Sequence, residues 1–122
     1  MLWQTGKWGD RMDAEQLLRN LGATGKLKGF FFAIYMIEKV KNEPAATTLI
    51  TKCLYPEAAK HFSVSAGAIE RNLRTLIRTC WNRPNRDFME EVAGASLYQQ
   101  PTNGEFLDMT AAYLRRQDTP QT

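Results

Sequence analysis

Apolar residues recur every three to four positions along most of this chain, with polar residues between them. This spacing is typical of amphipathic α-helices, whereas a β-strand needs an alternation of polar and apolar residues that no stretch here sustains. The pattern therefore predicts an all-α fold with six helices. Their expected ranges are 14–21, 26–42, 46–62, 66–83, 86–93 and 102 to at least 114.

Residues that favour helix ends stand at these boundaries. An N-cap side chain accepts a hydrogen bond from the first turn, glycine takes the left-handed conformation that ends a helix, and proline cannot continue one. The expected caps and stops are Asp13 with Gln16, Gly22, Pro44, Ser65, Pro84, Gly94, and the capping box of Thr102 with Glu105. Because Pro56 falls inside 46–62, we expect a kink there or two short helices.

The segment 26–42 is rich in aromatic residues and is apolar nearly all round in its middle. We therefore expect a central, buried helix. An aromatic cluster can instead be a stacking platform for single-stranded nucleic acid, but the basic residues that such platforms need are not interleaved here. In the segment 46–62, the residues expected to face inward are Leu49, Ile50, Cys53, Leu54, Ala58 and Phe62.

The stretch 58–81 has the pattern of a helix-turn-helix, in which the second helix enters the DNA major groove and the first braces it. Ala59 is small where the two helices must pack closely, and Val64 is expected to fill the turn. Ser63 stands where many such turns have glycine, and Asn72 where an apolar residue is common. At 100° per residue one sector of the second helix contains Ile69, Leu73, Leu76, Ile77 and Cys80, with Trp81 at its edge.

The opposite sector of that helix carries Arg71, Thr75 and Arg78. Arg71 is placed to contact a guanine edge with two hydrogen bonds, and Glu70 can accept one from a cytosine amine or orient the arginine. Small residues at the helix start let the backbone approach the groove. We expect base contacts from Glu70, Arg71 and Ala68, and backbone or flanking contacts from Lys60, Ser65, Gly67, Arg74, Thr75, Arg78 and Arg83.

Charge supports a nucleic-acid partner through its distribution more than its total. The net charge is only +3, with a pI near 9.0. Between Ser63 and Arg86 there are five arginines and one acid, Glu70, so positive charge is concentrated on one element. A DNA-docking surface needs such a concentration, although arginines on an amphipathic helix are more often simply its solvated face.

Length and composition suit one domain, with 122 residues, 43% of them hydrophobic and 24% charged. We expect an irregular arm at 1–11, an effector domain at 12–117 and a tail at 118–122. The longest apolar run, 30–37, is too short for a bilayer, which needs about 20 residues. The N-terminus has no signal-peptide pattern, so we expect a cytoplasmic, nucleoid-associated protein with no membrane partner.

No arrangement of residues typical of catalysis is found. His61, the only histidine, has no nucleophile partner in a recognisable motif, and we expect it to be solvated on the bracing helix. Cys53 and Cys80 both fall on apolar helix sides and are expected to be reduced core thiols. One histidine and two cysteines lack the spacing of metal ligands. We therefore expect no enzyme activity, no metal and no cofactor.

Several motifs together resemble one known family. Ile-Thr-Lys-Cys-Leu-Tyr-Pro at 50–56 and Pro-Thr-Asn-Gly-Glu-Phe at 101–106 are the most specific. Leu-Lys-Gly at 27–29, Ala-Lys-His-Phe at 59–62, Ile-Glu-Arg at 69–71 and Trp-Asn-Arg at 81–83 follow in the same order and spacing. From about Leu17 to Arg116 the chain resembles the C-terminal effector domain of stage 0 sporulation protein A, a response regulator of endospore formation in Firmicutes.

The resemblance implies a six-helix domain that binds a short specific DNA box and regulates transcription. It also implies that Glu70 and Arg71 match the base-contacting pair of the family, with Arg74 beside them. Family members pair head to tail on tandem boxes, so a homodimer on DNA is expected. They also contact the RNA polymerase sigma subunit through the segment matching about 85–97. We assign that contact here to Asn85, Phe88, Glu91 and Leu97.

The chain departs from the family pattern in three ways, and the first two favour an alternative function. Ala68 stands where a basic residue is usual, and residues 88–91 are bulkier and more acidic than in the family. Residues 1–16 are also too few for the receiver domain that precedes this domain in the family, so we expect an excised domain or a stand-alone paralogue that phosphorylation cannot switch. The alternative is an interaction protein that keeps the fold without binding DNA and modulates a related regulator or a sigma factor.

Overall fold

The computed structural model describes residues 12–118, and within this range it contains six α-helices and no strand. The expected all-α fold is therefore confirmed. The expected arm at 1–11 lies outside the described residues, as do residues 119–122. The α-helices are α1 (Ala14–Leu21), α2 (Gly29–Asn42), α3 (Tyr55–Phe62), α4 (Ala66–Trp81), α5 (Asp87–Ala93) and α6 (Asn103–Asp118).

The helix caps form as the local sequence predicted. Asp13 accepts a hydrogen bond from the Gln16 amide at 2.8 Å, and Gly22 ends α1 in the left-handed conformation, with φ 111°. Gly94 ends α5 in the same way. At the start of α6, the Thr102 amide donates to Glu105 and the Glu105 amide donates to the Thr102 hydroxyl. These reciprocal bonds satisfy two backbone donors that would otherwise lack partners.

The expectation of a break near Pro56 is confirmed, since α3 begins at Tyr55, but the α-helix expected before that break is wrong. A 3₁₀-helix, η3 (Pro44–Leu49), is followed by a π-helical turn, η4 (Ile50–Leu54), and only then by α3. The hydroxyl groups of Thr47 and Thr48 donate to the carbonyls of residues 44 and 45, which favours the tighter turn. Pro56 has no amide and would clash with the carbonyl four residues earlier, so the turn before it widens.

This irregular backbone also changes which side chains are buried. Leu54 and Ala58 are buried as expected, and Ile50 and Phe62 are partly buried. Leu49 is 48% exposed and Cys53 is exposed, so the expectation that both face inward is wrong. A sector calculated at 100° per residue does not apply to 3₁₀ and π turns, which rotate each residue by a different angle.

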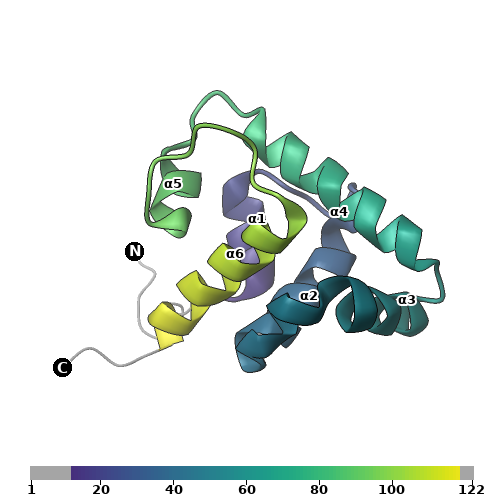
Figure 1. Cartoon of the computed structure of the whole chain (residues 1–122). Coiled ribbons are helices and arrows are strands. Elements are labelled where there is room, and N and C mark those ends of the chain that lie inside the picture. Colours follow the sequence, from purple (N-terminus) through teal and green to yellow (C-terminus); the bar gives the residue numbers. More distant parts are fainter. Residues whose placement is uncertain (1–11, 119–122) are drawn as a thin grey trace.

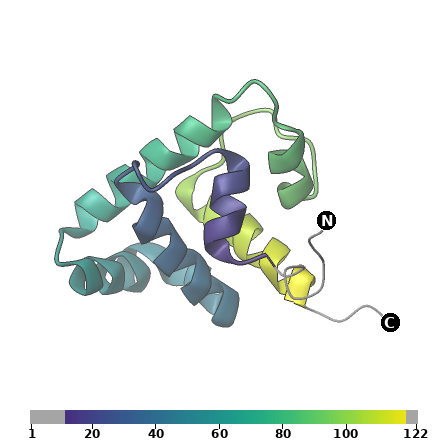
Figure 2. The same cartoon turned by 180° about the vertical axis from the view of Figure 1, so that it is seen from behind.

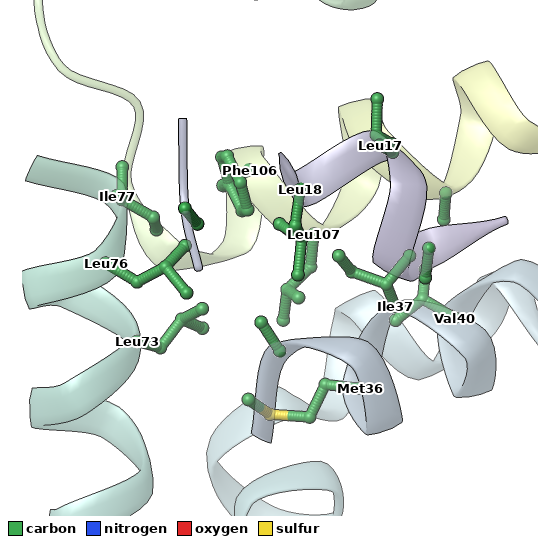
Figure 3. Close-up of a cluster of buried hydrophobic side chains, with 14 of the residues drawn as sticks. Leu17, Leu18, Met36, Ile37, Val40, Leu73, Leu76, Ile77, Phe106 and Leu107 are labelled. Atoms are coloured by element: carbon green, nitrogen blue, oxygen red, sulfur yellow. The ribbon is translucent and has the colours of Figure 1, made fainter. Parts of the chain in front are cut away.

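The core lies where α2, α4 and α6 meet, and α1 closes one side of it (Figure 1). Figure 3 shows side chains from these four helices converging on one cluster, among them Leu18, Met36, Leu73 and Phe106. All five apolar residues predicted for the inner sector of α4 are buried, and Trp81 is intermediate. The prediction of the inner face of α4 is therefore confirmed.

Helix α2 is central, but it is shorter and more exposed than expected. It begins at Gly29 instead of residue 26, and Phe31 is 55% exposed. Its outer side lies along α3, where Tyr35 stacks on His61 with ring centroids 4.4 Å apart. Lys39 of α2 pairs with Glu57 at 2.7 Å. These contacts show that α2 packs beside α3 (Figure 2).

Candidate nucleic-acid interface

The turn between α3 and α4 is held in a tight conformation by Ser63. This residue has φ 58° and ψ 46°, the only positive φ at a non-glycine residue within 12–118. Its amide donates to Lys60, and the next amide, of Val64, donates to the carbonyl of Ala59 at 3.0 Å. Val64 is 37% exposed, so the prediction that it fills the turn is wrong. The backbone hydrogen bonds fix the turn, and Ala59, which is buried, allows α3 to pack on α4.

The first turn of α4 is capped by Ser65, whose hydroxyl oxygen accepts from the Ala68 amide at 3.0 Å. This confirms the predicted N-cap. Gly67 is exposed and Ala68 is partly buried, so the backbone of this turn is covered by little side-chain bulk. Asn72 does not replace an apolar contact, because its amide donates back to the carbonyl of Ala68 at 2.8 Å. The buried Leu73 beside it supplies the apolar contact.

The five arginines between residues 63 and 86 have different surroundings. Arg74 pairs with Glu70 at 2.8 Å, one helical turn away, and both side chains are about half exposed. Arg86 donates to the carbonyl of Trp81 at 2.8 Å and its guanidinium lies 3.7 Å from the centroid of the indole ring. It therefore closes the C-terminal end of α4. The side chain of Arg83 lies over Gly22, at the end of α1.

On α4 itself, Arg71 and Arg78 are exposed, and neither side chain forms a hydrogen bond or ion pair within the described part of the chain. The guanidinium of Arg71 lies near Gly67, 4.0 Å from where a Cβ there would be, so it extends toward the start of α4. Thr75 is partly buried and its hydroxyl donates to the carbonyl of Arg71. Glu70 and Arg71 therefore project outward from the second turn of α4.

The structure gathers most of the predicted interface residues on the outer face of α4. Ser65, Gly67, Ala68, Glu70, Arg71 and Arg74 lie within its first turns, and Thr75 and Arg78 continue the same side. Lys60 is exposed on the last turn of α3. Arg83 follows the end of α4, which is Trp81 and not residue 83 as predicted. The residue before Pro84 is disfavoured in the helical conformation, which accounts for the earlier end.

Asn103 is a functional candidate that the sequence reasoning missed. Its side-chain amide donates to the Tyr55 hydroxyl at 3.0 Å and to the backbone carbonyl of Glu70 at 3.1 Å. It therefore connects α6 and α3 to the turn of α4 that carries the predicted base contacts. Burial raises the pKa of Tyr55, while the hydrogen bond from Asn103 opposes part of that rise. The sequence signal was present, because Asn103 belongs to the family-like run at 101–106.

The segment predicted to contact a sigma subunit is largely engaged within the domain. Phe88 packs edge-on against Tyr113, with ring centroids 6.0 Å apart, and Leu97 is partly buried. Glu90 accepts from the Leu97 amide at 2.8 Å, which holds the loop after α5. Asn85 and Glu91 are exposed. Asn85 accepts from the Asp87 amide at 2.8 Å, and Glu91 lies 3.5 Å from the Tyr113 hydroxyl.

The histidine, the two cysteines and metal-binding groups concern chemistry other than DNA binding. His61 is exposed as expected, stacked on Tyr35. Cys80 is buried, and burial raises the pKa of its thiol to about 11, whereas Cys53 is exposed, so the expectation of two core thiols holds for one of them. Residues 12–118 contain no group of three metal-binding side chains. No helix in this range is long and apolar enough to span a membrane.

A comparison with known protein families agrees with the geometry. The family model described as the sporulation initiation factor Spo0A C-terminal domain matches residues 14–114. This range includes α1 to α5 and most of α6, with the α3–α4 pair at its centre. The chain therefore belongs to the Spo0A C-terminal family. This family is a DNA-binding regulatory domain and not a family of enzymes.

Proposed function

We propose that this member of the Spo0A C-terminal family is a sequence-specific double-stranded DNA-binding regulator of transcription. In this proposal α3 and α4 form a helix-turn-helix, and α4 lies in the major groove. The observation that carries the proposal is the outward placement of Glu70 and Arg71, on a helix whose five predicted core residues are all buried. An exposed arginine without an ion-pair partner in the described structure is available to bind the O6 and N7 atoms of a guanine.

The proposal separates residues that specify sequence from residues that hold the DNA. Arg71 and Glu70 contact base edges, while Arg78 and Lys60 contact phosphates, which position the protein without distinguishing sequences. Arg74 is held against Glu70, so it orients that carboxylate and adds positive charge beside it. Ala68 lies against the groove floor without a polar group, so any base preference there comes from contact with a thymine methyl group.

The test is selection of bound duplexes from a random library, followed by affinity measurements on the selected sequence. We expect enrichment of one short motif. Substitution Arg71→Ala should weaken binding to that motif by about 1–3 kcal/mol and relax the preference at one base pair. Arg78→Ala should weaken binding to selected and random duplexes equally. Equal losses on both DNAs from both substitutions would contradict this division of roles.

The alternative function is an interaction protein that does not bind DNA. The Glu70–Arg74 ion pair favours it, because the carboxylate neutralises one arginine of the outer face. A library selection that enriches no sequence would support this alternative.

Under the leading proposal, the further partners are a second copy bound head to tail on tandem sites and a sigma subunit contacting Asn85 and Glu91. The location would then be the cytoplasm, at the nucleoid.

A further inference from the structure

The segment from Gly22 to Gly29, which joins α1 to α2, lies along one side of α4. Its Gly29 end meets the backbone of α4, and its Gly22 end lies beside the side chain of Arg83. At Gly22, a Cβ would lie 2.3 Å from a guanidinium nitrogen of Arg83, beyond the C-terminal end of α4. At Gly29, a Cβ would lie 2.4 Å from the carbonyl oxygen of Asn72, in the second turn of α4. Figure 2 shows this connection passing from the end of α1 across to α4 before α2 begins. We call it the flanking segment.

The flanking segment presents positive charge between these two ends. Ala23 is fully buried and Leu27 is partly buried, so the segment is held against the core. Lys26 and Lys28 are both exposed, and neither has an ion-pair partner within residues 12–118. Thr24 accepts from the Lys26 amide and from the Leu27 amide, which gives the segment a defined turn. The two lysines therefore start from a fixed backbone.

The position of this segment matters because an α-helix fills the major groove. A helix with its side chains is about 10–12 Å across, and the groove is about 12 Å wide. An element packed directly against the side of such a helix therefore faces the phosphates of the groove wall and not the bases. Gly29 is in direct backbone contact with α4, so Lys28 begins one residue from that contact.

The two sides of α4 differ in charge. On the side opposite the flanking segment, Asn103 contacts Glu70, and the start of α6 there carries the acidic residue Glu105. The flanking segment carries two lysines and no acid. A phosphate backbone is attracted to the side with the lysines, and this asymmetry would fix how the domain sits across the groove.

We infer that Lys26 and Lys28 form a second phosphate-binding site, which contacts the DNA backbone beside α4. This inference rests on the proposed function and adds the flanking segment to the interface. Each phosphate contact releases condensed counterions and contributes about 0.9 to the slope of log affinity against log salt concentration. The two lysines would therefore account for about 1.8 of the total slope.

The experiment measures that slope for the wild-type chain, Lys26→Gln, Lys28→Gln and the double variant, on the duplex selected from the random library. Arg116→Gln is the matched control, because it removes one exposed positive charge near the far end of α6 (Figure 1). We expect each lysine variant to lower the slope by about 0.9 and the double variant by about 1.8, on selected and random duplexes alike. Arg116→Gln should leave the slope unchanged.

The possible failures are distinguishable. If the wild-type chain binds the selected duplex and the lysine variants behave like Arg116→Gln, the phosphate site is refuted and the proposed function stands. If the wild-type chain shows neither sequence preference nor salt dependence, the proposed function is refuted and the phosphate site with it. Circular dichroism of each variant checks that the helices are intact, because all three side chains are exposed and their loss should not change the fold.

Discussion

The first turns of α4 and the short helix α5 both carry several charged residues, but they present them differently. On α4, the Arg71 side chain extends from the surface with no partner in the described structure. The backbone of the same helix is in close contact with Gly29 of α2. On α5, Met89 is buried, Phe88 packs on Tyr113, and Glu90 holds the Leu97 amide. The outer face of α4 therefore leaves Arg71 available for an interaction, while most of α5 packs within the domain.

The difference shows that exposure alone does not identify an interface. Arg86 is exposed, as Arg71 is, yet its side chain donates to the carbonyl of Trp81 at the end of α4 and lies over the indole ring. A functional side chain needs to be free at its tip and fixed at its backbone. Asn103 and Gly29 provide that fixation for α4 from its two sides. The difference between α4 and α5 can be tested by removing the contacts that Gly29 and Asn103 make with α4, and the hydrogen bonds that Glu90 and Glu91 make at α5.

The largest effect is expected from Gly29→Ala. The added methyl group would lie 2.4 Å from the Asn72 carbonyl oxygen and 2.8 Å from its carbon, and these are backbone atoms that cannot rotate away. Separating α2 from α4 should lower the free energy of unfolding by about 2–3 kcal/mol, as overpacking of a core does. Urea denaturation measures this loss.

Gly25→Ala is the matched control for that substitution. It adds the same methyl group in the same segment, where the nearest atoms are those of the Phe31 ring at 3.8 Å. Its unfolding free energy should stay within about 0.5 kcal/mol of wild type, as for most surface changes. Equal losses from the two substitutions would show that the close approach of α2 to α4 is not what supports α4.

A smaller effect is expected from Asn103→Ala. The substitution leaves the Glu70 carbonyl and the Tyr55 hydroxyl without their shared donor. We expect unfolding to become easier by about 1–2 kcal/mol. Because the turn carrying Glu70 and Arg71 loses its anchor, discrimination between selected and random duplexes should also fall.

Tyr55→Phe separates these two effects. It removes the hydroxyl group but leaves the bond from Asn103 to Glu70, so it should lower stability by about 1 kcal/mol with discrimination retained. If Tyr55→Phe reduces discrimination as much as Asn103→Ala does, the specific role of the contact with Glu70 is refuted. A double-mutant cycle of the two substitutions measures their coupling.

The smallest effects are expected on α5, from Glu90→Ala and Glu91→Ala. Glu90 accepts a 2.8 Å bond from Leu97, so its loss should cost about 1 kcal/mol of stability. Glu91 is exposed and its contact with the Tyr113 hydroxyl is long, at 3.5 Å, so its loss should cost less than about 0.5 kcal/mol. Neither change should alter the affinity for DNA by more than about twofold, within the range expected of distant independent sites. A large loss of DNA binding from either substitution would contradict the prediction that α5 takes no part in DNA binding.

The sequence predicted best what depends on near neighbours. Asp13, Ser65, Gly94 and the Thr102–Glu105 box act within four residues, and all of them form the predicted caps. The inner face of α4 was predicted completely, because a regular helix buried on one side keeps its period of 3.6. Local chemistry and regular geometry are therefore recoverable from the residues alone.

The sequence predicted less well what depends on distant contacts or irregular backbone. Asn103 reaches groups 33 and 48 residues away, and no local pattern indicates which carbonyl it bonds. Leu49 and Cys53 were assigned to the core because a regular helix was assumed through η3 and η4. The role of Gly29 depends on the close approach of two helices, which is a property of the packed fold.

Contact between Arg71 and a guanine base can be tested with a guanine analogue. Binding is measured to the selected duplex and to duplexes in which each guanine in turn is replaced by 7-deazaguanine, which lacks the N7 acceptor. At one guanine, we expect the replacement to weaken binding of the wild-type chain by about 1–3 kcal/mol and to have no further effect on Arg71→Ala. If wild-type binding is insensitive to the replacement at every guanine, or if both proteins lose affinity equally, Arg71 does not contact a guanine N7.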